Sequence, residues 1–135
     1  MNTSSQMDAT PAAMLWTGRV MSGLVIAFLI FDVGIKLIGL PIVAETMVQI
    51  GWPAAMGFTI GVIEAICLVL YVVPQTSVLG AILWTAVLGG AVATHLRIGS
   101  PLFSHTLFGV YLGLLMWGGL FFRDAQLRAL IPLRR

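Results

Sequence analysis

The chain has 135 residues, of which 59% are hydrophobic and only 9% are charged, and its formal net charge is +2. A soluble globular domain is about 25% charged, and so few charged side chains could not cover a soluble surface of this size. The small positive charge argues against nucleic acid as a partner, and the single cysteine excludes an intrachain disulfide. We therefore predict an all-α integral membrane protein.

The hydropathy pattern divides the chain into three parts. Residues 1–14 are polar and lack the basic start and small-residue cleavage site of a signal peptide. A four-helix transmembrane domain is expected over residues 15–122, followed by a basic cytoplasmic tail at 123–135. Each apolar stretch is close to the roughly 20 residues that a helix needs to cross a bilayer. The expected spans are residues 15–38, 54–73, 76–96 and 103–122.

The segment PIVAETMVQIGWP separates the first two spans. Val43, Met47 and Ile50 fall on one face of a helix, whereas Glu45 falls on another. This pattern predicts a short amphipathic helix lying in the membrane interface. Trp52, which follows it, is expected to be an interfacial anchor.

The distribution of arginine and lysine predicts the orientation of the spans. Cytoplasmic segments of membrane proteins carry an excess of basic residues. Two basic residues belong to one side of the bundle, Lys36 and Arg97. Five belong to the other, Arg19, Arg123, Arg128, Arg134 and Arg135. We therefore expect both termini in the cytoplasm and the protein in the bacterial inner membrane.

Small residues recur at fourth positions within the spans. Gly57 and Gly61 form a G-x-x-x-G pattern in the second span, and Gly109 and Gly113 form another in the fourth. Small side chains allow helix backbones to approach closely in lipid. We interpret the pattern as packing within one bundle, with a homo-oligomer interface as the alternative.

The ionisable side chains of the spans gather toward the outer half of the membrane. They are Asp32, Lys36, Glu64, His95, Arg97 and His105. A charge near the bilayer centre costs on the order of 3 kcal/mol, so Glu64 is expected to face the bundle interior, either paired or protonated. Asp32 and Lys36 have the spacing of a helical ion pair, which is a purely structural alternative for these two.

Helical periodicity groups these polar residues with aromatic ones. Glu64 and Tyr71 share a face of the second span, Trp84 and His95 share a face of the third, and Asp32 aligns with Lys36 on the first. Apolar walls with a few converging polar groups are typical of small-molecule sites. The candidate catalytic residues are Glu64, Asp32, His95 and His105. The candidate substrate-binding residues are Lys36, Arg97, Tyr71 and Trp84, which complete a pocket with aromatic walls.

The two histidines flank one short turn, and three interpretations remain open for them. His95 and His105 could relay protons or hydrogen-bond a ligand near neutral pH. They could instead anchor the turn among lipid headgroups. Haem ligation is the least favoured interpretation, and no metal site is expected because no further histidine or suitably placed cysteine is present.

The sequence also resembles the DoxX-like family of small four-helix bacterial membrane proteins. The resemblance runs from residue 18 to residue 132 and is most specific between residues 74 and 105. It is carried by the motifs P-x-T, L-G-A-I-L, L-G-G-A-V-A-T-H, R-x-G and P-L-F-S-H-T, in that order. The resemblance implies the four-helix fold, a membrane location and an association with membrane redox systems.

Taken together, these observations favour a redox-associated membrane component that binds a quinone or another lipophilic small molecule in the outer half of the bundle. A quinone is the favoured cofactor, and haem b is less favoured. A non-catalytic carrier or assembly subunit is the first alternative. An acid–base enzyme of the isomerase type is the second, since a desolvated carboxyl group near a histidine is suited to moving protons. The expected partners are the lipid bilayer, a lipophilic molecule, and either a second copy of the chain or a membrane redox protein.

Overall fold

The computed structural model describes residues 10–133, and every regular element in this range is helical. The predicted polar segment at 1–14 therefore lies largely outside the described residues, as do Arg134 and Arg135. The four longest helices are α2 (Ala12–Ile38), α4 (Met56–Val72), α5 (Ser77–Arg97) and α6 (Phe108–Arg123). The shorter elements are α3 (Pro41–Gln49), the 3₁₀ turn η1 (Pro74–Thr76), the π-helical turn η2 (Leu102–Thr106) and α7 (Ala125–Leu130).

Several of these helices suit a lipid bilayer. Three helical stretches are long and apolar enough to cross a membrane, namely Ala12–Ile38, Pro74–Arg97 and Leu102–Arg123. The remaining long helix, Met56–Val72, is apolar but has only 17 residues. The all-α prediction and the presence of several helices of spanning length are thus confirmed, and the count of four spans stays a prediction.

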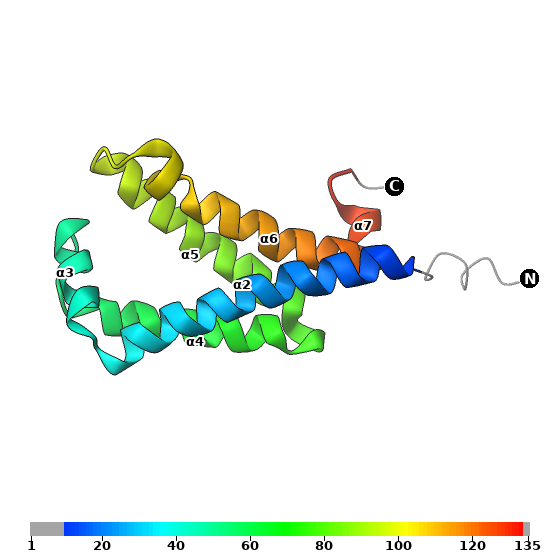
Figure 1. The fold of residues 1–135 in the computed structure, drawn as a ribbon, viewed down its shortest axis with the longest axis horizontal. Coiled ribbons are helices and arrows are strands. Elements are labelled where there is room, and N and C mark those ends of the chain that lie inside the picture. The colour runs from blue at the N-terminus through cyan, green and yellow to red at the C-terminus, as the bar shows by residue number, and fades with distance from the viewer. Residues whose placement is uncertain (1–9, 134–135) are drawn as a thin grey trace, which may run out of the picture.

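The four long helices form a ring in which neighbours run antiparallel. α2 packs against α4 and α6, and α5 closes the ring by packing against the same two helices (Figure 1). The beginning of α2 and the short α7 lie at one end of the bundle, which we call the terminal end. α3 and the turn between α5 and α6 lie at the opposite end, which we call the α3 end (Figure 1).

Turn residues fix the change of direction between the first two long helices. α2 stops at Gly39, whose φ of +73° lies in the left-handed region that glycine adopts without steric cost. Leu40 donates its N–H to the carbonyl of Ile35, 3.2 Å away, which satisfies one of the last carbonyls of the helix. Pro41 then begins α3, where its missing N–H and fixed φ are tolerated.

The short α3 confirms the helix predicted between the first two spans, and its apolar face packs against α4. Val43 and Met47 are buried, and a β-carbon at Gly57 would lie 2.5 Å from Cγ1 of Val43. The G-x-x-x-G pattern of the second span therefore begins with a glycine that seats α3. The position of this helix in the membrane interface stays a prediction.

The predicted basic tail is partly helical and packs on the bundle. The carboxylate of Asp124 accepts hydrogen bonds from the backbone N–H groups of Gln126 and Leu127 and so caps α7. The side chain of Leu127 joins the hydrophobic core. Arg128 donates to the carbonyls of Phe121 and Phe122, which ties the tail to the end of α6.

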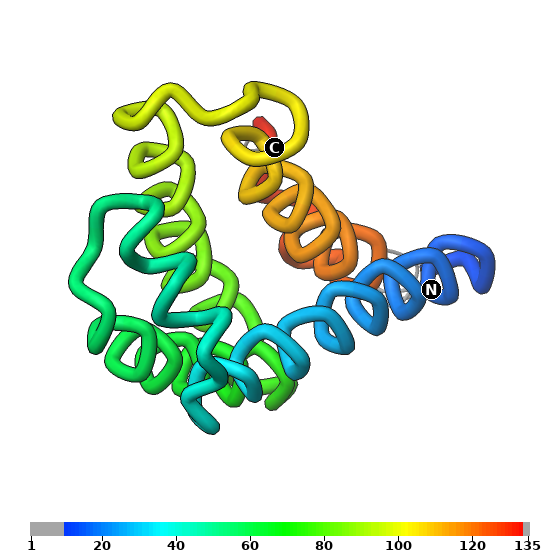
Figure 2. Tube along the Cα trace, turned by 60° about the vertical axis from the view of Figure 1, so that its left-hand side comes forward, coloured from blue at the N-terminus to red at the C-terminus, as the bar shows by residue number. Residues whose placement is uncertain are grey.

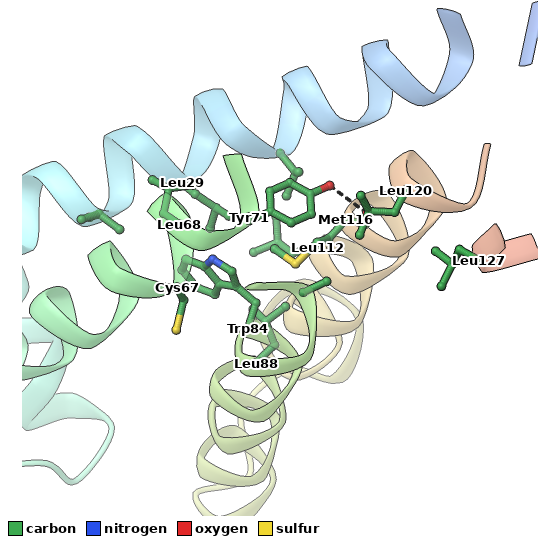
Figure 3. Packing of buried hydrophobic residues seen from close by; sticks show 13 residues of the cluster. Leu29, Cys67, Leu68, Tyr71, Trp84, Leu88, Leu112, Met116, Leu120 and Leu127 are labelled. Carbon is green, nitrogen blue, oxygen red and sulfur yellow. Dashed lines mark hydrogen bonds between the residues drawn. The ribbon is translucent and has the colours of Figure 1, made fainter. Parts of the chain in front are cut away.

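At the terminal end, α2 and α6 are in very close contact. Gly18 and Gly119 face each other across the helix pair, and a β-carbon at Gly119 would overlap Oγ of Ser22. Beneath this contact the hydroxyl of Tyr71 donates to the carbonyl of Met116 at 2.8 Å (Figure 3). α2 and α6 are thus tightly packed against each other near the terminal end.

This close contact yields a prediction about stability. Changing Gly119 to Ala forces a methyl group onto Ser22, and overpacking of this kind costs about 1–3 kcal/mol. The matched control is Gly23→Ala on α2, where a β-carbon would have nothing within 4 Å. We expect Gly119→Ala to lower the midpoint of thermal unfolding in detergent and Gly23→Ala to leave it unchanged or raise it. Equal midpoints for the two variants would contradict the close contact.

Candidate functional site

The site begins where α2 crosses α4 near the α3 end. A β-carbon at Gly61 would lie 2.8 Å from Cβ of Lys36, so the aliphatic stem of the lysine lies directly on the α4 backbone. Only a glycine at position 61 leaves this space. Glu64 follows almost one turn later on the same buried face of α4, within reach of the end of that lysine.

Lys36 joins two carboxylates from different helices. Its ammonium group donates to Oδ2 of Asp32 at 2.6 Å and to the two carboxylate oxygens of Glu64 at 2.8 and 2.9 Å. The side chain of Glu64 is 6% exposed, that of Lys36 14% and that of Asp32 28%. The predicted pair of Asp32 and Lys36 is therefore real, but it is part of a cluster of three that links α2 to α4.

The ion cluster lies on the wall of a cavity of about 410 Å³. Asp32, Lys36 and Glu64 all contribute to the lining, so the two acids share one cavity, which the sequence alone does not determine. The opposite wall comes from α5, mainly from small and aliphatic side chains, and includes His95. The α5 residues are Ala86, Val87, Gly90, Ala91, Thr94 and His95.

The cavity is covered at the α3 end by α3 and the loop that follows it. Met47, Ile50 and Trp52 line this side. The indole N–H of Trp52 donates to the hydroxyl of Thr94 at 3.3 Å, and Arg97 donates to the carbonyl of Ile50 at 3.2 Å. Figure 2 shows α3 beside the C-terminal half of α5, consistent with these two hydrogen bonds.

The two histidines lie side by side at the turn between α5 and α6. Their ring centroids are 5.9 Å apart and the rings meet edge to face. Nδ1 of His95 shares a hydrogen bond with the hydroxyl of Ser100, and Nδ1 of His105 shares one with Ser104. Only His95 lines the cavity, since His105 is exposed on the turn.

Tyr71 and Trp84 do not form the predicted aromatic walls of the cavity. Tyr71 and Trp84 are each 1% exposed and belong to the hydrophobic core (Figure 3). The hydroxyl of Tyr71 bonds with Ser22 and Met116, and the indole N–H of Trp84 has no hydrogen-bond partner among residues 10–133. Because the helices are closely packed there, these rings fill the core.

Arg97, a candidate substrate-binding residue, does not line the main cavity. Its guanidinium group bonds with the loop after α3 and lies in an adjoining cavity of about 420 Å³ beside Trp52. Arg97 therefore positions the covering loop. Within residues 10–133 no group of three or more histidine, cysteine, aspartate or glutamate side chains is arranged to hold a metal ion.

Sequence reasoning missed the contribution of α3 to the site. Thr46, Met47, Ile50 and Trp52 line the cavity, although the segment was expected only to lie on the membrane surface. Trp52 in particular was expected to be an interfacial anchor. The available signal was the pair Gly57 and Val43, because a glycine on the apolar face of the second span indicates that another backbone or side chain packs there.

The ion cluster yields a second prediction. Changing Lys36 to Met leaves Asp32 and Glu64 facing each other without a cation, and breaking a buried ion pair costs on the order of 3 kcal/mol. We expect a clear loss of thermal stability in detergent. The triple variant Lys36→Met, Asp32→Asn, Glu64→Gln removes all three charges and should recover most of the loss. A single variant that unfolds like the unaltered protein would show that the cluster does not hold α2 to α4.

Comparison with known proteins agrees with the architecture. A family profile described as the DoxX-like family matches residues 20–119, which include the whole ion cluster, both histidines and most of the four long helices. No curated protein and no solved structure matches the chain significantly. The match covers well over half of the sequence. The chain therefore belongs to the DoxX-like family.

Proposed function

We propose that this protein is a multi-pass membrane protein that binds a lipophilic small molecule in the cavity between α2, α3, α4 and α5. The observation that carries the proposal is the cavity of about 410 Å³, with largely apolar walls and the cluster of Asp32, Lys36 and Glu64 on one side. Sites for small molecules combine an apolar surface with a few polar groups in just this way. The cavity is large enough for a ring system or a short branched chain.

The membrane setting of the proposal is a four-span bundle. Its 17 residues give α4 a length of about 26 Å, near the roughly 30 Å of a bilayer core. With α2, α5 and the stretch from η2 through α6, the chain would cross four times, placing both termini in the cytoplasm. The arginines of the terminal end support this orientation, and the cavity then opens toward the outer half of a bacterial inner membrane.

This topology is testable by cysteine accessibility. In a Cys67→Ala background, Phe103→Cys places a thiol on the exposed turn at the α3 end, and Ala129→Cys places one on α7 at the terminal end. In intact bacterial cells whose outer membrane has been permeabilised, we expect a membrane-impermeant maleimide to label position 103 only. Both positions should be labelled after lysis. Labelling of both before lysis would show that α6 does not cross the membrane, and labelling of position 129 alone would contradict the proposed orientation.

The redox association of the proposal comes from the resemblance to the family, and a quinone is the lipophilic carrier that this resemblance suggests.

A non-catalytic carrier or assembly subunit is the second candidate. It is favoured by the geometry of Lys36, whose ammonium group is fully used in joining α2 to α4, so that the ions serve helix packing without any chemistry. Identification of the bound molecule separates the two candidates.

Ligand binding is tested by filling the cavity. Gly90 lines it, and a β-carbon there meets nothing within 4 Å, so Gly90→Phe should fold while occupying the space. Gly89→Phe is the matched control, because Gly89 is equally open but lines a separate groove between α5 and α6. We expect mass spectrometry of organic extracts to find a lipophilic molecule enriched in the unaltered protein and in Gly89→Phe, and depleted in Gly90→Phe. Identical extracts from all three would contradict the proposal.

A further inference from the structure

The cavity has almost no hydrogen-bond donor left for a ligand. Lys36 has three N–H groups, and they are directed to three carboxylate oxygens. The hydroxyl of Thr46 donates to the carbonyl of Ile42, and that of Thr94 donates to Gly90. The indole N–H of Trp52 is used on Thr94. A ligand that only accepts hydrogen bonds would therefore find little on these side chains.

His95 is the remaining donor candidate. One ring nitrogen shares a hydrogen bond with Ser100, which leaves Nε2 facing no partner among residues 10–133. In the neutral ring, Nε2 is a donor if the hydroxyl of Ser100 donates to Nδ1, and an acceptor in the other tautomer. The cavity thus offers at most this one free donor.

Acceptors, in contrast, are in excess. Each carboxylate has about four lone-pair positions, yet Asp32 accepts a side-chain hydrogen bond on Oδ2 alone among the described residues. Its Oδ1 is free, and Glu64 uses each oxygen only once. Counted as formal charges, the cluster has two carboxylates and one ammonium group, so this wall of the cavity carries one unbalanced negative charge. Asp32 is the more exposed of the two acids, so its carboxylate is the more accessible one to a ligand.

The covering loop adds an aromatic surface to this negative wall. Trp52 lines the cavity and is held in place through its N–H on Thr94. The face of an indole ring attracts cations, with a contribution that grows when water is excluded. The remaining lining from α5 is small and aliphatic and suits a hydrocarbon body.

From this balance of donors, acceptors and charge we infer that the cavity selects a lipophilic ammonium compound, an amine bound in its protonated form. Its N–H groups donate to the free Oδ1 of Asp32 and to Glu64, its charge balances the second carboxylate, and its hydrocarbon part lies against α5 beneath Trp52. The inference rests on the proposed function, because it names the ligand class of the same cavity. It disfavours oxidised quinones, whose carbonyl oxygens only accept hydrogen bonds.

The inference is tested with two probes that share one hydrocarbon cage, 1-adamantylamine and 2-adamantanone. Binding is measured through tryptophan fluorescence and saturation-transfer NMR in nanodiscs of zwitterionic phosphatidylcholine, with empty nanodiscs as the blank. Because hydrogen bonds that involve charged groups are the strong ones, we expect the amine to bind about tenfold or more tightly than the ketone. Asp32→Asn should remove most of this preference, and Gly90→Phe should abolish binding of both probes.

The outcomes separate the two proposals. Preferential binding of the amine that disappears in Asp32→Asn supports the inference. Equal or tighter binding of the ketone, lost in Gly90→Phe, overturns it while leaving the cavity as a ligand site, and loss of ketone binding in His95→Phe would then identify His95 as the donor. Failure of both probes to bind, together with organic extracts that do not differ between the unaltered protein and Gly90→Phe, overturns the proposed function itself.

Discussion

The ammonium group of Lys36 bonds with carboxylates from α2 and α4 at distances of 2.6 to 2.9 Å, and both the packing and the chemistry of the α3 end depend on this contact. In a bilayer core, polar groups have no water to bond with and must find partners inside the protein. Two acids and one base on helices that cross each other satisfy that requirement and also fix how those helices cross. The glycine at position 61 is the steric condition for the contact, since any larger residue would lift the lysine stem from α4.

The two ends of the bundle are built differently. At the terminal end, α2 and α6 meet through glycines, and the core around Tyr71 and Met116 is closed. Toward the α3 end the pair α5 and α6 diverges from α2 and α4 (Figure 1), and α3 with its following loop occupies the space. The cavity lies on the side where ions and two hydrogen bonds to the covering loop contribute to holding the helices together. A ligand site is therefore placed where the packing is least close.

The cluster has a consequence for what the cavity accepts. A lysine at a binding site would ordinarily supply donors, but here its three N–H groups are used within the cluster. The same bonds that hold α2 to α4 thus turn a wall with a basic residue into one that offers acceptors and negative charge. Trp52 follows the same principle, since its N–H holds the loop on Thr94 and only its ring face remains for a ligand.

Hydropathy and helical periodicity determined much of this protein without tertiary information. They predicted the long helices to within a few residues, the short helix at 41–49, the pairing of Asp32 with Lys36 and the inward position of Glu64, because an ionised group in lipid has few other solutions. Periodicity gives the face of a residue but not its depth relative to a neighbouring helix, and for this reason Tyr71 and Trp84 were assigned to the cavity while they fill the core. Only the tertiary structure placed α3 over the cavity, moved Arg97 onto the loop and showed that the donors of Lys36 are spent. These features depend on how helices far apart in the sequence approach one another. The spacing of residues along a single helix carries no information about that approach.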